Sequence, residues 1–379
     1  MPSTLFSQLQ SSRTQKQLTQ GQKLFVIGNF KEAKKAFKRA LKSDKNLLAA
    51  YAGLGKIAFA EEDWSEVNGQ FDKILDRDPN NIEAHYYRGI ANREIGKFRP
   101  KFANSIPLMN KLLEYQKSKK HFERVLAQDS LFSDVLYQYG LLKRYRDKYK
   151  EAIWLAQRQI ALKPELVAAQ VGLFRIYKYY IAGSGEDAAI TWLQEQPWQH
   201  AKFFIGEKYR RAKKFELADS VYKELLQEEM KMPVQPIYLA MAKSTYMQDE
   251  AELADSYYWQ AVENIKNQIE ADLVFENIKY IVNDSELTNF RATSTLEEKI
   301  DFFRAFWARR DPLPASKNNV RLAEHYRRLV FSEDNYEFSG FRTWVNSADK
   351  LKYLKFPATY KLNKEFNDKG LVYLRHGPP

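Results

Sequence analysis

The stretches GNFKEAKKAFKRALKSDKN (28–46) and EDWSEVNGQFDKILDRDPN (62–80) indicate an internal repeat, because the second has the same pattern as the first. Four apolar positions recur at one constant interval: Phe30, Ala33, Phe37 and Ala40 return as Trp64, Val67, Phe71 and Ile74. A period of roughly 34 residues fits one helix–turn–helix unit, which cannot bury its apolar face alone and stacks on its neighbours. The sequence therefore predicts an array of helix pairs.

The array continues along the chain with one interruption. Further copies follow at 85–98, 203–226 and 237–262, and a degraded copy at 167–198 has GSG (183–185) as its turn. The period slips by half a repeat where Pro100 and Pro107 would interrupt a helix. This slip predicts an insertion at about 100–116 between the two helices of the third repeat.

The spacing of small residues and aromatics over residues 14–265 resembles the tetratricopeptide repeat. The small residues that carry this resemblance are Gly55, Gly89, Gly140 and Gly206. A small residue where two helices cross, with a bulky one filling the gap to the next pair, favours stacking. We expect an all-α fold, an α-solenoid that ends in a small, mostly helical C-terminal module with a short strand or hairpin.

The resemblance implies that the first helix of each pair lines a concave groove. By phase, this groove displays one cation per repeat, with an aromatic a turn or two away. The predicted partner-binding residues are Lys56, Phe59, Tyr86, Arg93, Tyr137, Arg144, Arg175, Lys178, Phe203, Arg210, Lys243 and Tyr246. Such a surface suits an acidic or C-terminal peptide segment of a protein partner. The alternative, left open, is that the cations face solvent and the aromatics belong to the core.

The charge is distributed unevenly. The formal net charge is +12, yet residues 215–300 hold 7 Lys or Arg against 17 Asp or Glu. This pattern suits an acidic partner or self-association. Nucleic acid is a weaker hypothesis: the basic stretches 33–42 and 209–214 lie on second helices or turns, and the acidic segment would repel phosphate.

Near the C-terminus the helical pattern stops at RDPLP (310–314). Thr295 and Glu298 predict a capping box for the preceding helix, which has to end at Asp311–Pro312. We expect Arg310 to pair with Asp311, Trp307 to pack beneath the turn, and Ser316 or Asn318 to start the next helix. A short strand is predicted at 371–374.

Two motifs in this region resemble the GWxTD domain, over roughly residues 295–379. The matching residues are Trp307, Arg310, Asp311, Pro312, Pro314, Asn318, Asp368, Gly370, Tyr373, Gly377 and Pro378. The motif that names the family is lost except for Asp368, since residues 364–367 read KEFN. The resemblance implies a bacterial source, an envelope setting beside helical repeats, and no established enzymatic activity. Because family members usually continue beyond this point, we expect that the chain is a fragment or a shortened relative.

These observations predict an N-terminal tail (1–13), a repeat domain (14–265), a helical linker (266–294) and the C-terminal module (295–379). The predicted function is a non-enzymatic protein–protein interaction scaffold without a cofactor. A nucleic-acid-binding repeat protein is one alternative. The other is a hydrolase or metal site built from Arg310, Asp311, His325, Asp368 and His376.

The compartment follows less directly from the sequence. Cysteine is absent, which excludes disulfides and thiolate sites. We expect no membrane span and no signal peptide in this chain. The periplasm or envelope is predicted if a targeting segment was removed, and the cytoplasm otherwise.

Overall fold

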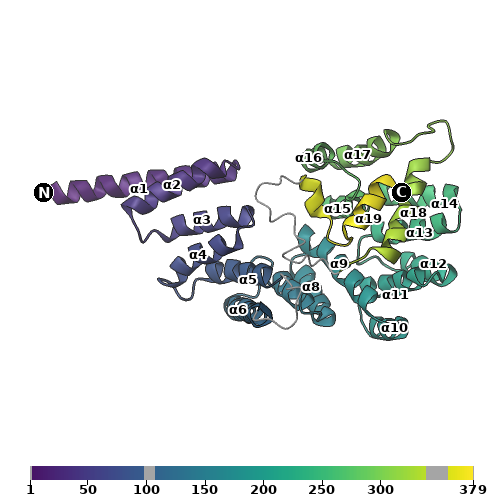
Figure 1. Cartoon of the computed structure of the whole chain (residues 1–379), viewed down its shortest axis with the longest axis horizontal. Helices are drawn as coiled ribbons and strands as arrows, with labels where there is room; N and C mark the ends of the chain where they lie inside the picture. The colour runs from purple at the N-terminus through teal and green to yellow at the C-terminus, as the bar shows by residue number, and fades with distance from the viewer. Residues whose placement is uncertain (1, 98–106, 339–356, 379) are drawn as a thin grey trace. The chain divides into compact units, whose positions relative to one another are not determined.

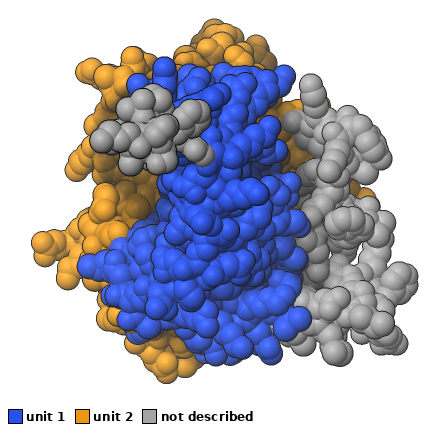
Figure 2. Space-filling model, turned by 90° about the vertical axis from the view of Figure 1, so that its left-hand side faces the viewer, with its two compact units in different colours: residues 1–155, 342–346 blue, residues 156–341, 347–379 orange. Residues whose placement is uncertain are grey.

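The computed structural model describes residues 2–97, 107–338 and 357–378 (Figure 1). Every regular element in these residues is a helix, apart from one isolated antiparallel bridge between Glu337 and Phe366. The all-α prediction is therefore confirmed. The chain divides into two compact units, coloured in Figure 2: unit 1 comprises residues 1–155 and 342–346, and unit 2 comprises 156–341 and 347–379.

Unit 1 consists of consecutive helix pairs. Its helices are α1 (Pro2–Val26), α2 (Phe30–Ser43), α3 (Leu48–Ala60), α4 (Trp64–Leu75), α5 (Ile82–Gly96), α6 (Pro107–Gln128), α7 (Val135–Arg144) and the first half of α8 (Tyr149–Leu162). The helices α1 with α2, α3 with α4 and α5 with α6 lie side by side. Part of the predicted insertion, residues 100–106, lies outside the described residues. The rest of it lengthens α6 at its N-terminal end.

The small residues of the repeat have the predicted role of allowing two helices to approach closely. A Cβ atom added at Gly55 would lie 2.5 Å from the Phe71 ring, and one at Gly89 would lie 2.6 Å from the Phe122 ring. In both pairs the aromatic ring comes from the second helix of the repeat and occupies the space that the glycine leaves. Phe71 and Phe122 are fully buried as a result.

Unit 2 continues the helix pairs and adds the C-terminal helices. Its elements after α8 are α9 (Val167–Gly183), α10 (Glu186–Gln194), α11 (Gln199–Arg211), α12 (Phe215–Leu226), α13 (Gln235–Met247), α14 (Ala251–Glu263), α15 (Gln268–Ile278), α16 (Asp284–Ala292), α17 (Leu296–Ala308), α18 (Val320–Asn335), the 3₁₀ helix η3 (Ala358–Leu362) and α19 (Asp368–His376).

The inner helices of unit 2 form a closed circuit. Helix α11 contacts α9 and α13, α13 contacts α15, and α15 returns to contact α9. Helix α18 also packs against α13. One hydrophobic cluster runs without interruption from Leu239 through Trp307 to Leu374. The C-terminal helices therefore share a core with the last repeats, while the predicted domain limits at 265 and 294 stay predictions.

Three local predictions near the C-terminus have different outcomes. The capping box of α17 is confirmed, because Thr295 and Glu298 bond each other's backbone N–H groups. Helix α18 is capped by Asn319 and not by Ser316 or Asn318, because the Asn319 side chain accepts the Leu322 N–H. The predicted strand at 371–374 is wrong.

Residues 371–374 lie in α19, whose period is helical. Leu371 and Leu374, three residues apart, are both buried, while Val372 between them is exposed. A strand would alternate its faces every second residue and could not bury this pair together. None of the helices in the described part of the chain combines the length and the apolar character that crossing a bilayer requires.

Candidate functional site on the inner helices

In unit 1, the side chains predicted to line the groove connect one repeat to the next. Lys56 Nζ lies 2.7 Å from the Glu83 carboxylate, and the Tyr86 hydroxyl donates to Asp134 at 2.5 Å. Arg93 donates to the backbone carbonyl of Gln138 at 3.0 Å and to its side chain at 2.7 Å. These bonds join α3 to α5 and α5 to α7, so they stabilise the stacking of the repeats.

The remaining predicted groove residues of unit 1 lie in or beside the core. Tyr137 and Arg144 are buried, and the Arg144 guanidinium lies 5.2 Å from the centre of the Tyr145 ring. Phe59 is half-buried and meets Tyr87 edge-on. Of the six predicted positions here, Lys56 and Phe59 are the two that are partly open to solvent.

In unit 2, two of the predicted cations, Arg210 and Lys243, are paired with Glu333 of α18. Arg210 donates to Glu207 at 2.8 and 3.0 Å and to Glu333 at 2.8 Å, while Lys243 donates to the other oxygen of Glu333 at 2.9 Å. The neighbouring Arg211 holds Glu337 through two bonds of 2.8 Å. Helix α18 therefore brings a carboxylate into the inner face, where two buried cations bind it.

A second group of charges lies around Glu365, which precedes α19. Arg175 Nε lies 2.7 Å and Lys279 Nζ lies 2.9 Å from Glu365 Oε1. The Tyr280 hydroxyl donates to Glu365 Oε2 at 3.2 Å, and Glu276 accepts from both Arg175 and Lys279. Five polar groups from α9, α15, the residues just after α15 and the C-terminal segment thus meet in one cluster, in which Arg175 and Glu276 are partly exposed and the other three are buried.

The pKa shifts of the acidic groups show that they are held as carboxylates. Burial alone would raise the pKa of Glu207, but the adjacent Arg210 outweighs burial and lowers it to about 2. For Glu333 and Glu365, burial is likewise outweighed: Lys243 and Arg210 lower the pKa of Glu333, and Lys279 and Arg175 lower that of Glu365. Burial dominates at Lys243 and lowers its pKa.

A pocket remains between the inner helices of unit 2. Its apolar lining comes from Phe174, Phe203 and Leu239, and the two charged clusters form its other sides. Lys178 on α9 also lines the pocket, is partly exposed, and makes no ion pair with any described residue. The pocket therefore combines an apolar floor with one cation whose charge is not neutralised by a direct contact.

The sequence predicted the cations of this face but not the carboxylates that meet them. Arg175, Lys178, Phe203, Arg210 and Lys243 all line the pocket or the buried clusters. Tyr246 is buried and donates its hydroxyl to Asp255 instead. Glu333 and Glu365 lie far beyond the last repeat in the chain. No local signal in the sequence marks them, since Glu333 is followed by Asp334 and Glu337.

The residues of the first C-terminal motif stabilise the turn after α17. Trp307 is fully buried, as predicted, and donates its ring N–H to the Tyr258 hydroxyl at 2.6 Å. The predicted pairing of Arg310 with Asp311 is wrong. Arg310 pairs with Glu286 at 2.8 Å, whereas Asp311 accepts the Leu313 N–H at 3.0 Å. Pro312 and Pro314 are exposed in the loop that follows, and Asn318 is half-buried.

The second motif surrounds α19. Asn367 caps the helix, Asp368 accepts from the Tyr360 hydroxyl at 3.2 Å, and the Tyr373 ring stacks on Phe331. A Cβ at Gly370 would lie 2.6 Å from Tyr336, so a close approach to α18 requires glycine there. Gly377 has a φ of +85°, which favours glycine, and Pro378 is exposed.

The two histidines of the hydrolase alternative lie in different environments. His325 is fully buried, and its Nε2–H donates to the Asn277 carbonyl at 2.9 Å. His376 is exposed at the end of α19. Among the described residues, no three His, Asp or Glu side chains are grouped so that they could hold a metal ion.

Comparisons with known proteins find weak similarity to solved structures. No family model matches the sequence, and no curated protein matches it either. The chain is similar to PilF of Pseudomonas aeruginosa, with 14% sequence identity and a TM-score of 0.38. The match covers 69% of this chain and 96% of the PilF chain.

Two further solved structures are similar to a comparable degree. The MamA protein is 20% identical in sequence, with a TM-score of 0.37, and the match covers 59% of this chain and 98% of the MamA chain. A tetratricopeptide repeat protein from Parabacteroides merdae is 17% identical in sequence, with a TM-score of 0.37. The match covers 70% of this chain and 98% of that protein's chain. Similarity at this level carries no information about function.

Proposed function

We propose that the chain is a non-enzymatic protein-interaction scaffold, and that the pocket on the inner helices of unit 2 receives an acidic side chain of a protein partner. The observation that supports this proposal is the unpaired Lys178 above an apolar floor. A carboxylate beside Lys178 would complete the charge balance of the pocket, and an adjacent apolar side chain of the partner would contact the pocket lining at Phe174 and Phe203.

The chain's own contacts provide a template for this recognition. The same inner helices already hold Glu333 and Glu365, which reach them from distant parts of the chain. Each carboxylate is bound by two cations at 2.7–2.9 Å. A partner carboxylate at Lys178 would extend this arrangement outward, from the buried clusters to the open mouth of the pocket.

The finer parts of the proposal rest on the sequence resemblance. They are a tetratricopeptide-type array with a GWxTD-like module at its C-terminal end, and an assembly in a bacterial envelope. The role of the C-terminal module in this proposal is to complete unit 2, because Glu365, Leu371 and Leu374 are buried against the last repeats.

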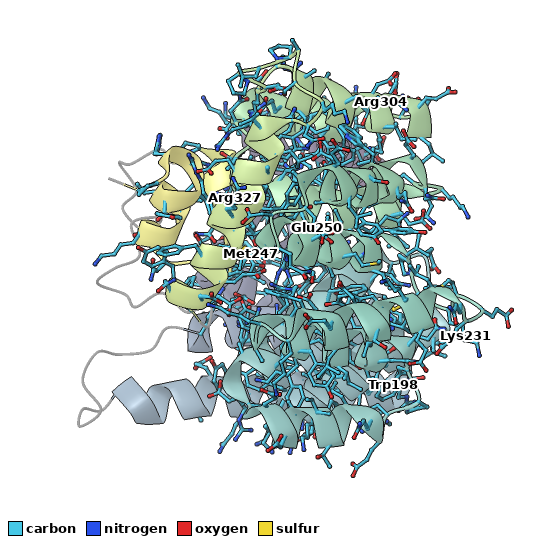
Figure 3. The ribbon with its side chains drawn as sticks, turned by 90° about the vertical axis from the view of Figure 1, so that its right-hand side faces the viewer. Trp198, Lys231, Met247, Glu250, Arg304 and Arg327 are labelled. Atoms are coloured by element: carbon cyan, nitrogen blue, oxygen red, sulfur yellow. The ribbon has the colours of Figure 1, made fainter. Side chains whose placement is uncertain are left out.

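The test is recovery of partners from the native source with tagged wild-type chain and with Lys178→Glu. Loss of a specific protein with Lys178→Glu supports the pocket as the binding surface. The matched control is Lys231→Glu, an exposed cation on the α12–α13 loop (labelled in Figure 3) that lies outside this pocket. Equal recovery by wild type and Lys178→Glu would reject the proposal.

A further inference from the structure

Helix α2 presents a solvent face that is almost entirely basic. Its buried residues are Ala33, Ala36, Phe37 and Ala40. At 100° per residue, the opposite face carries six cations within an arc of roughly 140°. These cations are Lys31, Lys34, Lys35, Lys38, Arg39 and Lys42.

Acidic side chains neutralise only part of this face. Lys34 pairs with Glu61 and Lys35 pairs with Glu32. Lys31, Lys38, Arg39 and Lys42 have no ion pair within the described part of the chain, and they extend over about 16 Å of helix. The face is therefore a continuous strip of positive charge, longer than the roughly 8 Å over which salt screens charges at physiological ionic strength.

An apolar tip adjoins this strip at the turn between α1 and α2. Val26 is 82% exposed and Ile27 is 74% exposed, the two highest values among the large apolar side chains described. Single exposed apolar residues are common in proteins, but two adjacent β-branched ones at a helix end are a small apolar surface.

The tip has a defined backbone geometry. The Asn29 N–H bonds the Leu24 carbonyl at 2.9 Å and the Gly28 N–H bonds the Phe25 carbonyl at 3.0 Å, with Gly28 at a φ of +76°. This pair of bonds is the Schellman arrangement that ends a helix. Beneath it, Phe25 and Phe30 are half-buried and in ring contact, and both pack on the core of the first repeats. Val26 and Ile27 are thus held outward by a rigid turn.

We propose that the α1–α2 hairpin is a docking surface for an anionic lipid bilayer. The basic strip faces the acidic headgroups, and Val26 and Ile27 enter the boundary between headgroups and acyl chains. A basic helical face with adjoining exposed apolar side chains is the combination that binds membrane surfaces without crossing them. The basic strip and the apolar tip both belong to the hairpin that α2 forms with α1 (Figure 1).

The apolar tip distinguishes this proposal from nucleic-acid binding. A strip of cations alone would suit phosphates of either kind. Val26 and Ile27, however, have no ring that could stack on a base, and they gain nothing from a phosphate backbone. Burial in the acyl boundary removes their apolar surface from water, so a lipid surface accounts for both features together.

The test is sedimentation of the full chain with vesicles of phosphatidylcholine alone and of phosphatidylcholine mixed with phosphatidylglycerol. Wild type is expected to bind the anionic vesicles, with an affinity that falls as salt rises. Lys38→Glu with Lys42→Glu is expected to weaken binding by more than roughly 30-fold, because the loss of each cation near the surface costs about fivefold and each new carboxylate is repelled by the anionic lipid. Val26→Ser with Ile27→Ser is expected to weaken binding by about tenfold or more.

Matched controls separate this surface from overall charge and hydrophobicity. Lys120→Glu with Lys223→Glu removes two exposed cations from other helices, and Val320→Ser with Val372→Ser removes two exposed valines. Both control variants are expected to bind like wild type, and circular dichroism checks that all variants fold. Equal binding to both kinds of vesicle would overturn the proposal, and so would unchanged binding of the Val26 and Ile27 variant. Salt-dependent association with RNA or between copies of the chain, without vesicle binding, would overturn it as well.

Discussion

Glu333→Gln is expected to destabilise unit 2 strongly, because it leaves a buried cation without its counter-charge. The Glu333 side chain is 4% exposed, and those of its partners Arg210 and Lys243 are 2% and 6% exposed, so water screens these charges only weakly. Arg210 keeps Glu207, but Lys243 loses its ion pair. Breaking a buried pair from one side costs about 3–5 kcal/mol.

Urea unfolding followed by circular dichroism measures this cost. Thermal unfolding gives a second measure. For a unit of this size, 1 kcal/mol corresponds to about 2–4 °C of melting temperature, so the melting temperature of Glu333→Gln is expected to fall by roughly 6–20 °C. Glu324→Gln on the same helix is the matched control. Its partner contact with Arg328 is partly exposed, so its cost is expected to be below about 1 kcal/mol.

A double variant tests the physical reason for the loss. Lys243→Met removes the stranded cation while keeping the length of the side chain. Glu333→Gln combined with Lys243→Met is therefore expected to be more stable than Glu333→Gln alone by about 2 kcal/mol or more. Equal costs for Glu333→Gln and Glu324→Gln, or a double variant no more stable than the single one, would refute this explanation.

Three further predictions concern stability. Glu207, Glu333 and Glu365 have pKa values lowered below those of an unfolded chain. The stability that they contribute is therefore complete above about pH 4.5 and is lost as the pH falls through their folded pKa values. Urea midpoints measured from pH 7 to pH 3 should decline, and the midpoint of the wild type should decline more than that of Glu333→Gln. Gly89→Ala should cost about 1–3 kcal/mol, because its Cβ collides with the Phe122 ring, whereas Gly69→Ala, where a Cβ meets nothing, should be neutral or stabilising in the same assay. Thr295→Ala should cost about 1 kcal/mol by removing the cap of α17, and an unchanged urea midpoint would contradict the role of the capping box.

The sequence predicted the helix pairs because their packing is local and periodic. Gly55 and Phe71 lie within one repeat, so the recurrence of the same pattern in the next repeat carries the information about the contact. The capping box of α17 was likewise predictable, because capping residues act on their immediate neighbours, whereas the helix ends at Ala308, three residues before the predicted stop at Asp311–Pro312. The strand predicted at 371–374 was wrong because four apolar residues cannot define a period by themselves.

The sequence predicted the cations of the candidate site but not the carboxylates that pair with them. The helical phase placed Arg175, Arg210 and Lys243 on inner helices, and they are found there. Nothing local in the sequence indicates that Glu333 and Glu365 return to meet them, since both contacts depend on the path of the chain after the repeats end. The Arg310–Glu286 pair was missed for the same reason, because adjacency in sequence favoured Asp311.

The return of α15 onto α9 distinguishes unit 2 from an open array. In a linear stack each repeat touches only its neighbours, so the stack tolerates insertion or deletion of whole repeats and frays from its ends. Joining the last inner helix to the first removes the free ends. A repeat added to or cut from unit 2 would break the circuit, whereas the same change between α2 and α3 would merely alter the number of stacked pairs.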